Sequence, residues 1–216
     1  MNRVRTGLAT AVLLAAVGIV SFAQDHAATS APARQGSEKA GAQSAEESRY
    51  AEIAKAFADA AATGPRHADL ERYLGEWDVA FVYKMVPGRT TEEKGTATFR
   101  WLIEGRWLIE ELDANFSGRP FKGFNLIGYD NLKKQYVGCW VDSMSTSMIL
   151  ASGAMDPSNS LLTTYSELDD LARNMRGKIM QSTTRFVDEK TMIYTTSDVL
   201  WGETRTMFEA TYTRKK

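Results

Sequence analysis

From Gly75 to the C-terminus, apolar and polar residues alternate with a period of two in one run after another. Successive side chains of a β-strand point to opposite faces, so this alternation predicts strands with one buried and one exposed face. We expect ten strands, at 76–86, 92–103, 106–116, 121–129, 135–143, 146–154, 160–167, 178–187, 191–200 and 204–214. Short segments such as "PGR" and "DPSNS" separate the runs and are typical of hairpin turns.

Many strands of similar length joined by short turns favour an all-β fold. We predict an antiparallel up-and-down barrel of about ten strands at residues 75–216, preceded by one or two N-terminal helices. Closing the sheet removes the two exposed edges that a flat sheet would leave. An open sheet or a sandwich is the alternative.

The first 23 residues have the layout of a secretory signal peptide. Arg3 and Arg5 precede an apolar run, and the small residues Ser21 and Ala23 surround Phe22 at its end. We expect cleavage near Ala23 and export to the periplasm or the cell exterior, without stable membrane insertion afterwards. A permanent membrane anchor is the alternative, but the apolar run is short for a span of about 20 residues.

Two further segments precede the predicted barrel. Residues 24–47 are rich in Ala, Ser, Gly and charge and have no aromatic residue, which predicts a disordered tether. Residues 48–74 are predicted to be helical, because Tyr50, Ile53 and Phe57 have the spacing of one apolar helical stripe. A Gly-Pro pair should end this helix, and a second short helix should lead into the first strand.

Charge and composition exclude several classes of protein. The chain has 26 Lys and Arg against 27 Asp and Glu, so it has no electrostatic preference for nucleic acid. Its two histidines, His26 and His67, lie outside the predicted barrel, which argues against a Ser–His–Asp triad and a histidine metal or haem site. The single cysteine, Cys139, can form no internal disulfide. We expect neither a metal nor a cofactor.

Two carboxylates are candidates for the interior of the barrel. Glu110 alternates with Leu108 and Leu112, so we expect it inside or near a rim. Asp142 and Ser143 are neighbours in a strand and point to opposite faces, so they cannot form a nucleophile–base pair. The residues expected to line a ligand cavity are Phe81, Tyr83, Phe99, Trp101, Glu110, Trp140, Asp142, Met144 and Phe208. Which face of strand 135–143 points inward is left open by the sequence.

Several segments together resemble a bacterial family described as a domain of unknown function, DUF1579. They are "LERYLGEWDV", "GRPFKGFNLIGYDNLKKQYVGCWVDSMST" and the closing "EATYTRK". The family resembles lipocalin-like (calycin) barrels, so the resemblance implies the same fold that the alternation predicts. It implies no reaction.

Gly75-Glu76-Trp77 also resembles the lipocalin G-x-W signature at the start of the first strand. In such barrels the tryptophan closes one end, and a basic residue of the last strand packs over it. Arg214 stands at that position here. The resemblance therefore implies a structural barrel-end plug of Trp77 and Arg214, in which the guanidinium stacks on the indole.

These observations favour an exported barrel that binds a small, mainly apolar ligand and is a carrier rather than an enzyme. One alternative is an enzyme that uses Glu110 and Asp142 as an acid pair on a small hydrophobic substrate. Another is a filled barrel that serves as an interaction or stress module. The sequence names no ligand, no reaction and no oligomeric state.

Overall fold

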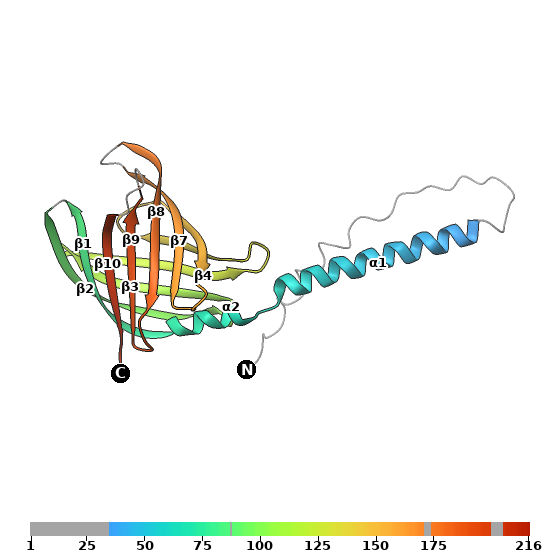
Figure 1. Cartoon of the computed structure of the whole chain (residues 1–216), viewed down its shortest axis with the longest axis horizontal. Coiled ribbons are helices and arrows are strands. Elements are labelled where there is room, and N and C mark those ends of the chain that lie inside the picture. The colour runs from blue at the N-terminus through green and yellow to red at the C-terminus, as the bar shows by residue number, and fades with distance from the viewer. Residues whose placement is uncertain (1–34, 87, 171–173, 200–204) are drawn as a thin grey trace, which may run out of the picture. The chain divides into compact units, whose positions relative to one another are not determined.

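The computed structural model describes residues 35–86, 88–170, 174–199 and 205–216 (Figure 1). The predicted signal peptide and the first part of the predicted tether lie outside these residues. The chain divides into two compact units, residues 1–53 and 54–216.

Helix α1 (Gln35–Ala61) begins earlier than predicted, because the segment from Gln35 onwards, expected to belong to the disordered tether, is helical. Ala, Glu, Gln and Lys are strong helix formers, and their abundance there explains the helix without any buried face. Tyr50, Ile53 and Phe57 do form a stripe, but all three side chains are exposed. Among the described residues, no helix combines the length and the apolar character that crossing a membrane needs.

Ten strands form one closed barrel, as predicted. They are β1 (Gly75–Val86), β2 (Arg89–Ile103), β3 (Trp107–Phe116), β4 (Arg119–Asp130), β5 (Gln135–Asp142), β6 (Ile149–Met155), β7 (Leu161–Asp170), β8 (Met175–Phe186), β9 (Thr191–Asp198) and β10 (Arg205–Arg214). Each strand is antiparallel to its neighbours in sequence, and β1 closes the barrel by pairing with β10.

The register shows which face of each strand lies inside the barrel. Trp77 of β1 lies opposite Ala97 of β2 and Arg214 of β10, and Phe81 lies opposite Ala210. Trp77, Phe81 and Ala210 are almost completely buried. Residues opposite one another on paired strands share a face, so this register identifies the inner residues of all ten strands.

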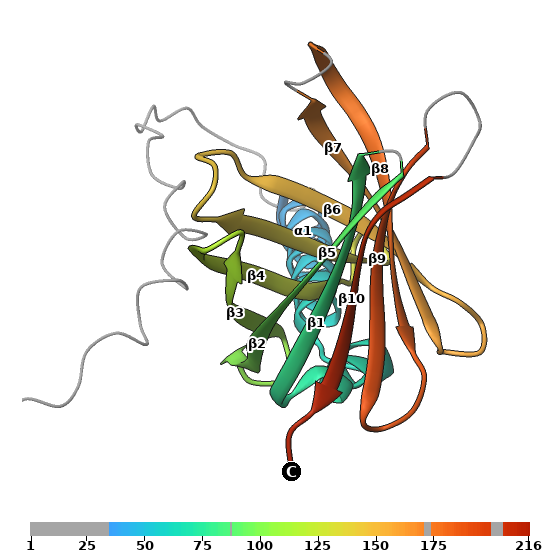
Figure 2. The same cartoon turned by 90° about the vertical axis from the view of Figure 1, so that its left-hand side faces the viewer.

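Short helices close one end of the barrel. Helix α2 (Pro65–Ala68) and the 3₁₀ helix η1 (Asp69–Tyr73) lie beside the start of β1 and the end of β10 (Figure 2). Leu70 and Tyr73 of η1 belong to the buried core, and the Tyr73 carbonyl accepts a hydrogen bond from the Trp77 indole at 2.7 Å.

Arg214 completes this closed end, and the structure brings it onto Trp77 as the lipocalin-like signature implies. Its guanidinium carbon lies 4.1 Å from the Trp77 ring centroid. The same group donates to the carbonyls of Arg72, Leu74 and Glu189. Stacking and three carbonyl contacts use the planar, multiply donating guanidinium fully, so this residue joins the helical cap to β1.

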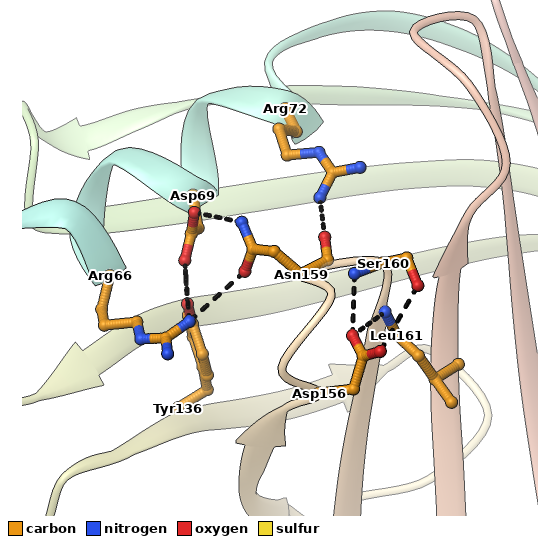
Figure 3. A network of polar contacts seen from close by, with 8 residues as sticks. All are labelled: Arg66, Asp69, Arg72, Tyr136, Asp156, Asn159, Ser160 and Leu161. Carbon is orange, nitrogen blue, oxygen red and sulfur yellow. Dashed lines mark hydrogen bonds and ion pairs between the residues drawn. The ribbon is translucent and has the colours of Figure 1, made fainter.

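A polar network fastens the cap to the barrel wall (Figure 3). The Asp69 carboxylate accepts hydrogen bonds from the Tyr136 hydroxyl of β5, at 2.7 Å, and from the Asn159 amide of the β6–β7 turn, at 2.6 Å. Arg66 donates to the Asn159 side chain, and Arg72 donates to its carbonyl. The cap is therefore held to β5 and to the β6–β7 turn as well as to β1.

Candidate functional site

The inner face of β1, β2 and β10 is mainly aromatic. The rings of Phe81 and Phe208 stack 5.8 Å apart, and Tyr83 stacks on Phe81 at 6.3 Å. Phe99 of β2 is 3% exposed, and the half-buried Trp101 packs against the same core. These five residues were predicted to line a cavity, and all of them lie on the inner face of β1, β2 or β10.

The inner face of β8 and β9 carries hydroxyl groups, which were not predicted from the sequence. The Tyr194 hydroxyl donates to Ser182, whose hydroxyl also contacts Thr196 at 3.1 Å. Thr184 of β8 is buried next to them and lies opposite Tyr194. The barrel therefore has an aromatic side on β1–β2 and β10 and a hydroxyl-bearing side on β8–β9.

Glu110 of β3 lies inside the barrel among apolar residues and is 4% exposed. In register it stands between Phe99 of β2 and Asn125 of β4. Its Oε1 accepts a hydrogen bond of 2.8 Å from the hydroxyl of Tyr212 on β10. Burial raises the pKa of Glu110 from 4.5 to about 7, although hydrogen bonds from Tyr212 and Asn125 act in the opposite direction.

Phenol rings surround this carboxyl. Tyr212 and Tyr73 both lie close to Phe99, with ring centroids 6.0 and 5.4 Å away. Burial, with the nearby Glu110, raises the pKa of Tyr212 well above its ordinary value, so its hydroxyl stays protonated as a donor. Within the described part of the chain, no Lys or Arg forms an ion pair with Glu110.

Asp142 ends β5 on the same inner face, because it lies opposite Gly123, which lies opposite the buried Leu112. This settles which face of the strand points inward. The Asp142 carboxylate accepts hydrogen bonds from the Trp140 indole at 2.9 Å and from the backbone N–H of Met144 at 2.8 Å. Its partners differ from those of Glu110, and it holds the turn that follows β5.

Met144, predicted to line the cavity, is 73% exposed. It lies in the turn beyond β5, because the strand ends at Asp142 and the alternation of faces ends with it. The Ser143 backbone N–H donates to the Lys122 carbonyl, and the Ser143 hydroxyl accepts from the Lys122 N–H, so Ser143 fastens the turn to β4.

The inner wall on β4–β7 retains solvent-accessible surface although its residues point into the barrel. We call this set the accessible inner wall; it consists of Asn125, Gly138, Trp140, Ile149, Ala151 and Thr164. At Gly138, an added Cβ would meet only the Leu126 carbonyl at 3.5 Å and the Asn125 side-chain oxygen at 3.6 Å, both ordinary contacts. The wall next to Glu110 therefore has room for additional atoms.

An ion-pair triad lies on the inner face of the barrel, near the end opposite the helical cap. The Lys178 ammonium of β8 is 2.8 Å from Asp198 of β9 and 3.1 Å from Asp170 of β7, and its side chain is 3% exposed. This triad was not predicted from the sequence. The signal available was a lysine at an inward position of the alternation, but its two partners come from strands that only the register brings together.

The histidine that the structure describes lies in the helical cap. His67 of α2 is buried at the closed end, where its Nδ1 accepts a hydrogen bond from the Gly64 N–H at 3.2 Å. Burial lowers the pKa of His67, and the charge of Arg106 lowers it further. Among the described residues, no group of three or more His, Cys, Asp and Glu side chains is placed to hold a metal ion.

Comparisons with known proteins add a family and a fold. The model of the family described as "Protein of unknown function (DUF1579)" matches residues 62–214. No curated protein matches the chain. Rv2717c from M. tuberculosis aligns over 72% of this chain and 100% of its own, with a TM-score of 0.52 and 12% identity. A redesigned β-barrel, b11L5F_LGL, aligns over the same shares with a TM-score of 0.38 and 13% identity. The first likeness shows the fold alone, and no argument rests on the second.

Proposed function

Because the chain belongs to the DUF1579 family, which brings a barrel but no activity, we propose its function from the site itself. The protein is an exported carrier of a small, mainly apolar ligand. The ligand lies inside the barrel against the accessible inner wall, and its polar group is oriented by Glu110 and the donors around it.

The buried carboxyl of Glu110 is the observation that carries this proposal. A carboxyl that is 4% exposed, with no basic partner among the described residues, costs folding free energy. Replacing it with an apolar residue would remove that cost, so its presence supports a role in binding. Asn125, which is half-buried on the accessible inner wall, links the carboxyl to that surface.

The export part of the proposal rests on the first 23 residues. Two arginines, an apolar run and a small-residue cleavage sequence ending at Ala23 support it. Sequencing the N-terminus of the protein recovered from outside the inner membrane tests it, with Gln24 expected as the first residue.

A variant that fills the accessible inner wall tests ligand binding. Gly138→Leu adds a side chain where a Cβ has only ordinary contacts, so the barrel should still fold. The control is Val137→Leu, which adds a methylene to the adjacent residue on the outer face. We expect the wild type and the control to bind the neutral, solvent-sensitive dye Nile red, and Gly138→Leu to bind it at least about tenfold more weakly.

Native mass spectrometry of the mature wild-type protein complements the dye measurement. A mass increment that disappears in Gly138→Leu supports the carrier. Equal dye affinities of the wild type and Gly138→Leu, or no dye binding and no mass increment in the wild type, would overturn it.

A further inference from the structure

The inner face of the barrel carries charges of both signs, and Glu110 is the acidic residue buried there without an ion-pair partner among the described residues. Residues are assigned to this face by the strand register and, for Asp170, by its contact with Lys178. Its acidic residues are Glu93, Glu110, Asp142, Asp170 and Asp198. Its basic residues include Lys178, which is buried, and the exposed Arg119 and Arg205, which lie opposite Phe116 and Asp198 in the register.

Two of the basic groups near the interior, Lys178 and Arg214, are already bound by other residues. Lys178 contacts two carboxylates, at 2.8 and 3.1 Å. Arg214, at the closed end, stacks on Trp77 and donates to three carbonyls. A ligand carboxylate or phosphate placed beside Glu110 would therefore meet another acidic group without gaining a cationic partner there, which disfavours an anionic ligand at this site.

A cationic ligand, in contrast, meets favourable groups at the site. Phe99, Tyr73 and Tyr212 surround Glu110, and Trp140 lies on the accessible inner wall two strands away in the same register row. Aromatic faces attract cations, most strongly where water is excluded. Asn125, which hydrogen-bonds Glu110, stands between Glu110 and Trp140 in that row, so the carboxyl and the indole belong to the same part of the inner wall.

We propose that the ligand is an organic cation, an amine or quaternary ammonium on an apolar skeleton, whose charge pairs with Glu110 beside the Trp140 ring. This inference rests on the proposed carrier function and specifies the chemical class of its ligand. The apolar skeleton lies against the aromatic side of the barrel.

The proposal implies a definite pH dependence. Pairing requires ionised Glu110, and burial raises its pKa to about 7. The side chains that face it are Tyr212 of β10, Tyr73 of η1, Asn125 of β4 and Phe99 of β2, with Tyr194 of β9 beyond them. Burial raises the pKa values of Tyr73 and Tyr212, so both stay neutral near pH 7. Affinity for a permanent cation should therefore increase as pH rises through about 7.

Three compounds with the same alkyl chain separate the classes. Decyltrimethylammonium, decanol and decanoate, each below its micelle concentration, are allowed to displace Nile red from the mature wild-type protein. We expect the cation to bind tightest and decanoate weakest. Its affinity should fall about tenfold for each pH unit well below the pKa, while the affinity for decanol stays constant.

Glu110→Gln is the matched variant, because Gln keeps the size and can still accept from Tyr212. It should lose at least about tenfold in affinity for decyltrimethylammonium and keep its affinity for decanol. Decanol or decanoate binding as tightly as the cation, or a cation affinity that is independent of pH and of Glu110, would overturn the cationic ligand and leave the carrier intact. Failure of Nile red and all three compounds to bind would overturn the carrier itself.

Discussion

At the scale of single residues, Glu110 shows both the reach and the limit of sequence reasoning. Its alternation with Leu108 and Leu112 was sufficient to predict an inward side chain. Its hydrogen bond to Tyr212, in contrast, joins residues about a hundred positions apart. Such a contact depends on the stagger of non-adjacent strands around the barrel, which a local alternation does not encode.

Replacement of Glu110 by Gln should increase the free energy of unfolding above about pH 7 and leave it nearly unchanged near pH 4. The folded protein holds the Glu110 proton up to about pH 7, whereas an exposed carboxyl releases it near 4.5. The native state therefore binds more protons than the unfolded chain between these values, and wild-type stability falls by about 3 kcal/mol as pH rises through them. Urea unfolding at a series of pH values measures this slope.

Glu111→Gln provides the control for that measurement. Glu111 is the next residue of β3, points outward and pairs with Arg100 at 3.0 Å on the exposed surface. An exposed pair contributes less than about 1 kcal/mol, so this variant should keep the wild-type slope. A Glu110→Gln protein with the same pH slope as the wild type would show that the carboxyl is not strained by burial.

At the scale of elements, strands were predicted better than helices. Strand positions follow from a period of two that burial imposes, and all ten strands are present. The start of α1 was missed because its first half is stabilised by helix propensity and not by an apolar face. The cap was missed as a functional unit because Asp69, Tyr136 and Asn159 come from three separate segments.

Asn159 offers a test of how the cap is held. Its backbone is left-handed, with φ of 58°, and its side chain bonds Asp69 and Arg66. Asn159→Gly tolerates that backbone but loses the side-chain bonds, which should cost about 1–2 kcal/mol. Asn159→Ala should cost about 1 kcal/mol more, because a Cβ disfavours the left-handed conformation.

Thermal unfolding ranks the two Asn159 variants, and amide hydrogen exchange locates the effect. We expect faster exchange in Asp69–Tyr73 than in the strands far from the cap. If both variants matched the wild type in stability and in exchange of this segment, the network would not be what holds the cap.

At the scale of the whole molecule, pairing of β1 with β10 makes all ten strands one closed barrel. Truncation after Asp198 removes β10 and leaves β1 and β9 with unpaired edges, so we expect loss of the native fold and aggregation. The control removes only Lys216, which lies beyond β10 and should be dispensable. Size-exclusion chromatography and near-ultraviolet circular dichroism compare the two. A soluble, native-like monomer lacking β10 would contradict this view.

The pairing of Trp77 with Arg214 also limits how early the barrel can close during folding. The ribosome makes the chain from the N-terminus, so β1 and the residues that plug the closed end wait for their last partner until synthesis is almost finished. Every shorter nascent chain has an open seam and an incomplete plug. This order would be an advantage for a chain that crosses a membrane unfolded, because the barrel cannot close before the last strand has crossed. Under the proposed export, the strand order would therefore delay closure of the barrel until β10 has crossed the membrane.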